Sequence, residues 1–160
     1  MRVHKIVPLA FLAVSLAWAG PASADPARQA INPEKLFDPT EYGYSHANVV
    51  AAASRTVYVA GQVGIADGGP NDFESQVDRA FENLLAVLEA SGSGAEHVVK
   101  ITLLIKDHNP DKLGYVVKKR KAVFGAKPPA STLIPVTRLY GEGVSFEIDA
   151  IAVVNSRHEP

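Results

Sequence analysis

Two segments with helical periodicity, interleaved with β-prone runs, constrain the fold of this chain more than any other feature of its sequence. In the first segment, apolar residues recur at helical spacing across 73–88, and the serine-glycine stretch 91–94 ends the pattern. Asn71 and Glu74 have the spacing of a capping box, which satisfies the first amide groups of a helix. We therefore expect a helix from residue 71 to about residue 90, with one face covering a sheet.

The second helical segment begins at Asn109-Pro110, which supplies an N-cap and a first-turn proline, and ends at Gly125, a C-cap glycine. Arg120 interrupts its apolar positions. We interpret the basic run Lys118-Lys119-Arg120-Lys121 as a solvated face near the end of the helix, where cations complement the helix dipole. A nucleic-acid patch is the alternative interpretation of this run.

β-branched and apolar residues dominate five further runs, at 48–53, 56–63, 98–105, 130–136 and 144–154. Because only Ser54-Arg55 separates the first two runs, we expect them to form a hairpin. The complete order, β-β-α-β-α-β-β, predicts an α+β fold in which both helices cover one face of a mixed sheet.

The first 24 residues have the pattern of a signal peptide. Basic residues precede an uncharged apolar run at 6–20, and Ala22-Ser23-Ala24 is a small-x-small cleavage pattern. A retained membrane anchor is the alternative, but the run is shorter than the roughly 20 apolar residues that cross a bilayer. We expect cleavage after Ala24 and a periplasmic or secreted protein that is not attached to a membrane.

Removing residues 1–24 from the 160 leaves 136, enough for one domain with a sizeable core. We expect 25–39 to be an exposed lead-in, 40–156 a single domain and 157–160 a tail. The mature chain has 14 basic and 17 acidic residues, a net charge of −3, because the signal removes Arg2 and Lys5 and no acid. This balance argues against nucleic acid or an anionic membrane as the main partner.

The chain has no cysteine, which excludes disulfides, thiolate metal sites and cysteine nucleophiles. Its histidines show no ligand spacing, such as two histidines four residues apart on a helix. The sequence also contains no Gly-rich phosphate loop and no nucleophile elbow. We expect neither a metal nor a cofactor.

Four positions invite a functional and an ordinary structural interpretation. Glu147 and Asp149 alternate with apolar residues and so leave the same face of one strand, which a half-exposed strand also explains. Taken alone, Tyr44 fits a half-buried packing tyrosine, and Gly61 fits a bulge or a close approach inside a strand.

Four motifs together resemble the RidA/YjgF family of enamine and imine deaminases and their non-catalytic relatives. The motifs are Tyr44-Ser45-His46-Ala47, Tyr58-Val59-Ala60-Gly61-Gln62, the run from Pro129 to Leu139, and Phe146-Glu147-Ile148-Asp149-Ala150-Ile151-Ala152. The resemblance extends from about Tyr44 to Val154 and includes the order of helices and strands. It implies a homotrimer with the sheets facing inward and small-molecule clefts between neighbouring subunits.

The resemblance also implies which residues line each cleft. Carried over by motif, these are Tyr44, Gly61, Ser131 and Glu147, with Glu147 as the catalytic group that activates water and the other three binding substrate. An asparagine of the family's second helix falls near Val117 here. In the implied reaction, water attacks the carbon of an imine and ammonia leaves.

Ser131 stands where the family carries an arginine that grips the substrate carboxylate. A neutral hydroxyl cannot replace a guanidinium fork, so we expect activity on α-imino acids to be abolished or nearly abolished, and to rise in Ser131→Arg. Arg138 lies an odd number of strand residues away and is not an obvious substitute. The sequence therefore predicts a hydrolase for an imine or enamine without an α-carboxylate. A non-catalytic metabolite-binding or chaperone-like protein is the alternative, and an endoribonuclease fits the net charge less well.

Overall fold

The computed structural model describes residues 28–50, 52 and 54–155, so the predicted signal peptide and the tail 157–160 lie outside the described residues. The elements, in chain order, are β1 (Arg28–Ile31), η1 (Thr40–Tyr42), β2 (Ala47–Val50), β3 (Ser54–Val63), α1 (Phe73–Ala90), η2 (Ala95–His97), β4 (Val98–Lys106), α2 (Pro110–Phe124), β5 (Ala130–Val136) and β6 (Phe146–Asn155). None of the helices in these ranges has the length and apolar character needed to cross a membrane.

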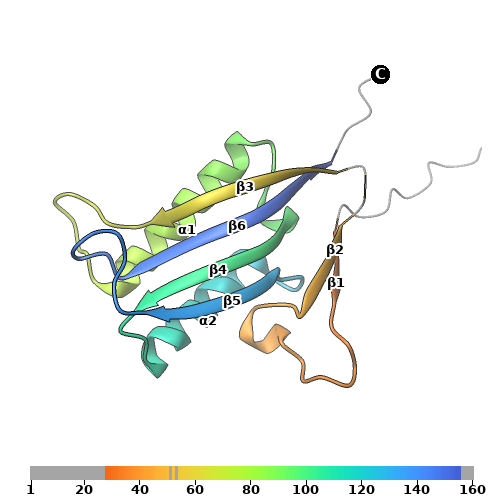
Figure 1. Cartoon of the computed structure of the whole chain (residues 1–160), viewed down its shortest axis with the longest axis horizontal. Coiled ribbons are helices and arrows are strands. Elements are labelled where there is room, and N and C mark those ends of the chain that lie inside the picture. Colours follow the sequence, from red (N-terminus) through yellow and green to blue (C-terminus); the bar gives the residue numbers. More distant parts are fainter. Residues whose placement is uncertain (1–27, 51, 53, 156–160) are drawn as a thin grey trace, which may run out of the picture.

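The main sheet has four strands in the order β3-β6-β4-β5, and both long helices lie on one of its faces (Figure 1). Strands β4 and β5 run parallel because α2 crosses over between them, whereas β6 is antiparallel to both of its neighbours. This arrangement confirms the predicted α+β fold with a mixed sheet and two helices on one face.

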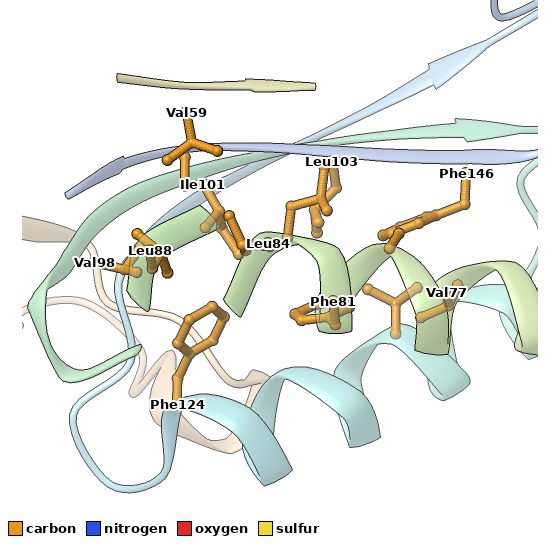
Figure 2. Packing of buried hydrophobic residues seen from close by; sticks show 14 of the residues in the cluster. Val59, Val77, Phe81, Leu84, Leu88, Val98, Ile101, Leu103, Phe124 and Phe146 are labelled. Carbon is orange, nitrogen blue, oxygen red and sulfur yellow. The ribbon is translucent and has the colours of Figure 1, made fainter. Parts of the chain in front are cut away.

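The hydrophobic core fills the space between this sheet and the two helices (Figure 2). Every second residue of β4 from Ile101 onward is buried, which is the alternation expected of a strand with one covered face. Phe81 of α1 stacks on Phe146 of β6, with ring centroids 6.1 Å apart, and packs at the same distance against Phe124 of α2. The three aromatic rings join both helices to the sheet.

The helix termini agree with the sequence at three of four ends. Asn109 caps α2 by accepting from the Lys112 amide at 2.9 Å, and Gly125 ends the helix with a positive φ of 60°. The predicted cap of α1 at Asn71 is wrong: Asp72 accepts from the Ser75 amide at 2.9 Å and the helix begins at Phe73.

Asn71 cannot cap the helix because its side-chain amide is engaged in the preceding loop. Its carboxamide oxygen accepts from the Ala66 amide at 3.0 Å, and its nitrogen donates to the Ala66 carbonyl at 2.8 Å. The residue closes the loop from β3 to α1, and the next residue in sequence takes the cap.

The predicted hairpin of residues 48–53 with 56–63 is also wrong. Strand β2 pairs antiparallel with β1, which lies inside the segment that we expected to be an exposed lead-in, while β3 pairs with β6. Figure 1 shows the β1–β2 pair standing beside the β5 end of the main sheet, away from β3. The short polar strand β1 has weak periodicity, which is why the sequence pattern did not reveal it.

Arg28 fixes the β1–β2 pair to the rest of the domain. Its guanidinium donates to the Glu96 carbonyl at 2.7 Å, to Asn48 Oδ1 at 2.8 Å and to the Lys127 carbonyl at 2.6 Å. Burial lowers the pKa of this guanidinium from its ordinary value. Three segments far apart in the sequence are thus held by one side chain.

Candidate functional site

A pocket of about 520 Å³ lies between helix α2, strand β5 and the segment that leads into β2. Its walls are mainly aromatic and aliphatic, and they include two residues that the sequence predicted, Tyr44 and Ser131. The complete lining is Phe37, Tyr42, Tyr44, Leu113, Val117, Arg120, Ser131 and Leu133. Val117, the position that aligns near the family's asparagine, contributes an apolar wall.

Tyr44 is held in the pocket wall by its neighbour in the sequence. Ser45 is almost fully buried, its amide donates to the Pro129 carbonyl at 2.8 Å, and its hydroxyl donates to the Pro128 carbonyl at 2.7 Å. A parallel bridge also joins Ser45 to Ala130 at the start of β5. These contacts tie Tyr44 to the strand that carries Ser131.

Aromatic rings surround the mouth of this pocket. Phe37 packs edge-on against Tyr42, Tyr44 and His46, with centroid separations of 6.1, 6.4 and 5.2 Å. His46 Nε2 lies 3.0 Å from the Phe37 carbonyl, which fixes the turn that places these rings. Phe37 remains 59% exposed and Tyr42 53% exposed, so large apolar surfaces flank the opening.

Ser131 faces the helices. In the parallel ladder it pairs with Ile101, and laterally paired residues of adjacent strands point to the same side of a sheet. Because Ile101 belongs to the core under the helices, the Ser131 side chain lies on that side, where it contacts Arg120 of α2.

Arg120 is the residue of this pocket that the sequence analysis missed. It is only 4% exposed, so the interpretation of the basic run 118–121 as a solvated face is wrong at this position. Its Nη1 donates to Ser131 Oγ at 3.0 Å, its Nη2 donates to the Tyr42 carbonyl at 2.7 Å, and its Cζ lies 5.8 Å from the Tyr44 ring centroid. Burial lowers the pKa of the Arg120 guanidinium from its ordinary value.

A sequence signal for Arg120 did exist. Val116 and Phe124 are buried on the inner side of α2, and Arg120 lies midway between them at spacings of four residues. A basic residue on the apolar stripe of a helix indicates a buried cation rather than a surface one. Its two lysine neighbours in the sequence obscured that signal.

Glu147 and Gly61 are brought together on the opposite face of the sheet. A β-bulge between Val59 and Gln62 places Gly61 against the Glu147 side chain, so closely that a Cβ atom on residue 61 would overlap the carboxylate. A side chain at residue 61 would therefore displace the Glu147 carboxylate from this position. The two residues were predicted together, and they form one local unit.

The four predicted residues therefore separate into two groups. Tyr44 and Ser131 line the pocket on the helical side, whereas Glu147 pairs with Leu104 and lies on the face that no described helix covers. Phe146 and Ile148, on either side of Glu147 in the sequence, both point into the core. A single subunit cannot bring the two groups into contact because the sheet lies between them.

Arg138 does not join either group. It follows the end of β5 and lines a separate pocket of about 320 Å³ with Lys106 and Glu142. Within one subunit, Arg138 therefore does not line the pocket that contains Ser131. Among the described residues, no three histidine or acidic side chains gather closely enough to hold a metal ion.

Comparison with known proteins supports the resemblance found in the motifs. Residues 37–154 match the family described as endoribonuclease L-PSP. The chain is 37% identical over 116 residues to the RutC family protein UK114 of Drosophila melanogaster, which covers 68% of this chain and 80% of that protein. It is 35% identical over 114 residues to 2-iminobutanoate/2-iminopropanoate deaminase of Rattus norvegicus, with coverage of 69% and 79%.

The same relationship holds among solved structures. The Rid family protein YyfB of Yersinia pestis superposes with a TM-score of 0.75 at 30% identity, covering 81% of this chain and all of that one. The superposition shows that YyfB and this chain share the α+β fold. The chain belongs to the endoribonuclease L-PSP family, whose members include the RidA/YjgF proteins.

Proposed function

We propose that this chain hydrolyses a small imine or enamine at clefts between the subunits of a homotrimer, with Glu147 activating the attacking water. The observation that carries the proposal is the packing of the Glu147 carboxylate against the bare backbone of Gly61. Because residue 61 has no side chain, the Glu147 carboxylate can occupy the space that a Cβ atom would fill and lie directly against the strand backbone.

The chemistry needs one group that moves a proton. Glu147 takes a proton from water as the oxygen attacks the imine carbon, and it returns the proton to the nitrogen of the resulting carbinolamine. Glu147 then carries the hydroxyl proton of the carbinolamine to the same nitrogen as the carbon–nitrogen bond breaks, which gives a carbonyl compound and ammonia. No redox cofactor is needed because the carbon keeps its oxidation state.

The separation of the two residue groups supports an assembly. Tyr44 and Ser131 can meet Glu147 only if a second copy presents its uncovered sheet face to the pocket of the first. That face carries large apolar side chains: Tyr58 is 79% exposed and Ile134 is 42% exposed. Burying such a patch against another copy is favourable. In a closed ring of three copies, the patch of every copy is buried.

The relatives support an imine as the substrate. Proteins of Rattus norvegicus and Mus musculus, each 35% identical to this chain, are 2-iminobutanoate/2-iminopropanoate deaminases. Because the resemblance implies an arginine where this chain has Ser131, we propose the reaction class from these relatives and not their individual substrates.

An ammonia-release assay on the purified mature protein tests the proposal. Imines generated in situ, with and without a carboxylate, should release ammonia faster with the protein than without it. Glu147→Gln should abolish the acceleration while Asp149→Asn, two residues along the same face, should retain most of it. If Glu147→Gln retains full activity, Glu147 is not the group that activates water.

A non-catalytic metabolite-binding protein remains the second candidate, since the pocket of Tyr44 and Ser131 forms without Glu147. Saturable binding of a small molecule without ammonia release from any imine would favour it. Light scattering coupled to size exclusion tests the assembly that the hydrolase requires, because a homotrimer has about three times the monomer mass.

We also propose that the protein is exported and that cleavage occurs between Ala24 and Asp25. The basic start, the apolar run and Ala22-Ser23-Ala24 support this proposal. The intact mass of the periplasmic or secreted protein should correspond to a chain that begins at Asp25. Cytosolic protein that retains Met1 would contradict it.

A further inference from the structure

We infer that Arg120 is the anion-binding residue of the pocket and that its ligand is a small carboxylate with an apolar body. The inference rests on the proposed function only in identifying that ligand as the substrate. It reverses the expectation that a serine at position 131 leaves the pocket without a cation.

The first support is a buried cation without an anion. The ion pairs among the described residues are His97 with Glu96 and Lys119 with Asp78, and neither involves Arg120. A guanidinium remains charged at any physiological pH, and burying such a charge without a counter-charge is costly. None of the residues that line the pocket is acidic, so an anion entering it would meet a cation and no repulsion.

The second support is an unused donor. The Arg120 Nε atom is buried and has no hydrogen-bond partner among the described residues, although Nη1 and Nη2 each have one. A buried N–H without an acceptor costs free energy that a bound oxygen would recover. The remaining capacity of a guanidinium suits a carboxylate, which accepts two parallel N–H bonds.

Ser131 adds a second donor at the same place. Its oxygen accepts from Arg120, which leaves its O–H proton available for an acceptor in the pocket. The bonds of Arg120 to Ser131 and Tyr42 also hold the guanidinium in one orientation before a ligand arrives. A donor pair fixed in advance loses little conformational freedom on binding.

The remaining walls define the rest of the ligand. Leu113, Val117 and Leu133 are aliphatic, and Phe37 and Tyr42 present aromatic rings. These surfaces favour an apolar or aromatic body attached to the carboxylate. A highly polar anion such as inorganic phosphate would leave the apolar walls in contact with polar oxygens.

Calorimetric titration of the full mature protein tests the inference with phenylacetate and its neutral isostere phenylacetamide. We expect phenylacetate to bind at least about tenfold more tightly, as charge-assisted hydrogen bonds predict. Equal affinities in the unmodified protein, or no saturable binding of phenylacetate, would overturn the inference without any mutant.

Variants at position 120 test whether Arg120 causes the preference for the carboxylate. Arg120→Met should remove the preference for the carboxylate, and Arg120→Lys should retain only part of it because an ammonium lacks the planar fork. Lys118→Met, an exposed position on the same helix, should leave it unchanged. A folded Arg120→Met protein that still prefers phenylacetate would also overturn the inference.

Ammonia release and carboxylate preference, both measured on the unmodified protein, separate this inference from the proposed function. Carboxylate preference without ammonia release from any imine would contradict the hydrolase and leave the anion site intact. Release of ammonia from neutral imines without any carboxylate preference would contradict the anion site and leave the hydrolase intact.

Discussion

The guanidinium of Arg120 and the hydroxyl of Ser131 are joined by a 3.0 Å hydrogen bond that connects helix α2 to strand β5 at the floor of the pocket. The two positions therefore act as a unit, in which the helix supplies the charge and the strand supplies the hydroxyl. A substitution at either position changes the environment of the other.

Ser131→Arg should destabilise the protein and weaken phenylacetate binding, the reverse of the gain expected from the sequence alone. The new guanidinium would lie beside the buried Arg120, and two like charges in one desolvated pocket repel each other. The double variant Ser131→Arg/Arg120→Ser should recover both stability and binding, since it restores one cation. Thermal unfolding and calorimetry measure the two effects. A stable single variant with tighter binding would show that the pocket accommodates both cations.

Mixing two inactive variants should restore part of the ammonia-release activity. If Arg120 of one subunit and Glu147 of its neighbour complete each site, random trimers of Arg120→Met and Glu147→Gln chains contain about a quarter of intact sites. The mixture is prepared by co-refolding and compared with each variant refolded alone. Activity that stays at the level of the separate variants would mean that no site is shared between subunits.

Gly61→Ala should abolish most of the activity because the added methyl group would displace the Glu147 carboxylate from its position on the sheet. Gly114→Ala in α2 is the matched control, because a Cβ atom there meets nothing within 4 Å. The control should stabilise the helix by about 0.5–1 kcal/mol and leave the rate unchanged. Steady-state rates and thermal unfolding of both variants check these outcomes. Full activity in Gly61→Ala would contradict the role of the bare backbone.

Arg28→Met should lower the free energy of unfolding by about 2–4 kcal/mol, because three hydrogen bonds of a largely buried cation are lost together. It should also weaken ligand binding, since the β1–β2 pair leads directly to Tyr44. Arg55→Met, at an exposed position of β3, should change neither property. Urea denaturation gives the stability, and an unchanged midpoint for Arg28→Met would show that β1 contributes nothing to the fold.

The phenol of Tyr115 should titrate at a higher pH than the phenol of a free tyrosine. Burial first, and then its hydrogen bond to Asp78, raise the pKa of its phenol from 10.0 to about 12. Because the pKa of this phenol is higher in the folded state, the neutral phenol contributes fully to folding stability below pH 10. That contribution disappears as the pH rises towards 12. Absorbance titration against Tyr115→Phe isolates this phenol, and Asp78→Asn should lower its pKa without returning it to 10.0. An unshifted Tyr115 would show that the link to Asp78 does not persist in solution.

The carboxyl group of Asp78, which accepts the hydrogen bond from Tyr115, responds to pH in the opposite direction. Lys119 is the main cause that lowers the pKa of Asp78 from 3.8, followed in the same direction by the Tyr115 hydroxyl. This contribution is present above pH 3.8 and is lost as the pH falls below that value. The contact between α1 and α2 is thus expected to weaken at both extremes of pH.

Much of the architecture could be predicted from the sequence because it depends on periodicity. The apolar spacing of 73–88 predicted one helix, the caps at Asn109 and Gly125 predicted the other, and the β-prone runs predicted the strands of the main sheet. Strand β1 could not be predicted, since its four residues are held by Arg28 contacts to segments 20 to 99 residues away. Local patterns carry no information about such distant partners.

The candidate site was predicted only in part for a similar reason. The motif resemblance predicted that Tyr44, Gly61, Ser131 and Glu147 line the cleft. It could not show that the sheet separates these residues into two groups. Arg120 was missed because, in the linear sequence, a charged residue between two lysines resembles a surface residue. Its place between Val116 and Phe124 was the available signal, and the packing of α2 on β5 shows that its side chain is buried.

The bonds of Ser45 to Pro128 and Pro129 have a consequence for how the pocket chooses its ligands. Tyr44 and Ser131 are tied to the same stretch of backbone, so thermal motion of that stretch carries both walls together and preserves the gap between them. His46 and Arg120 hold the backbone carbonyls of Phe37 and Tyr42, but the side chains of these two residues are more than half exposed. The pocket should therefore discriminate strongly among ligands of different thickness and only weakly among ligands of different length.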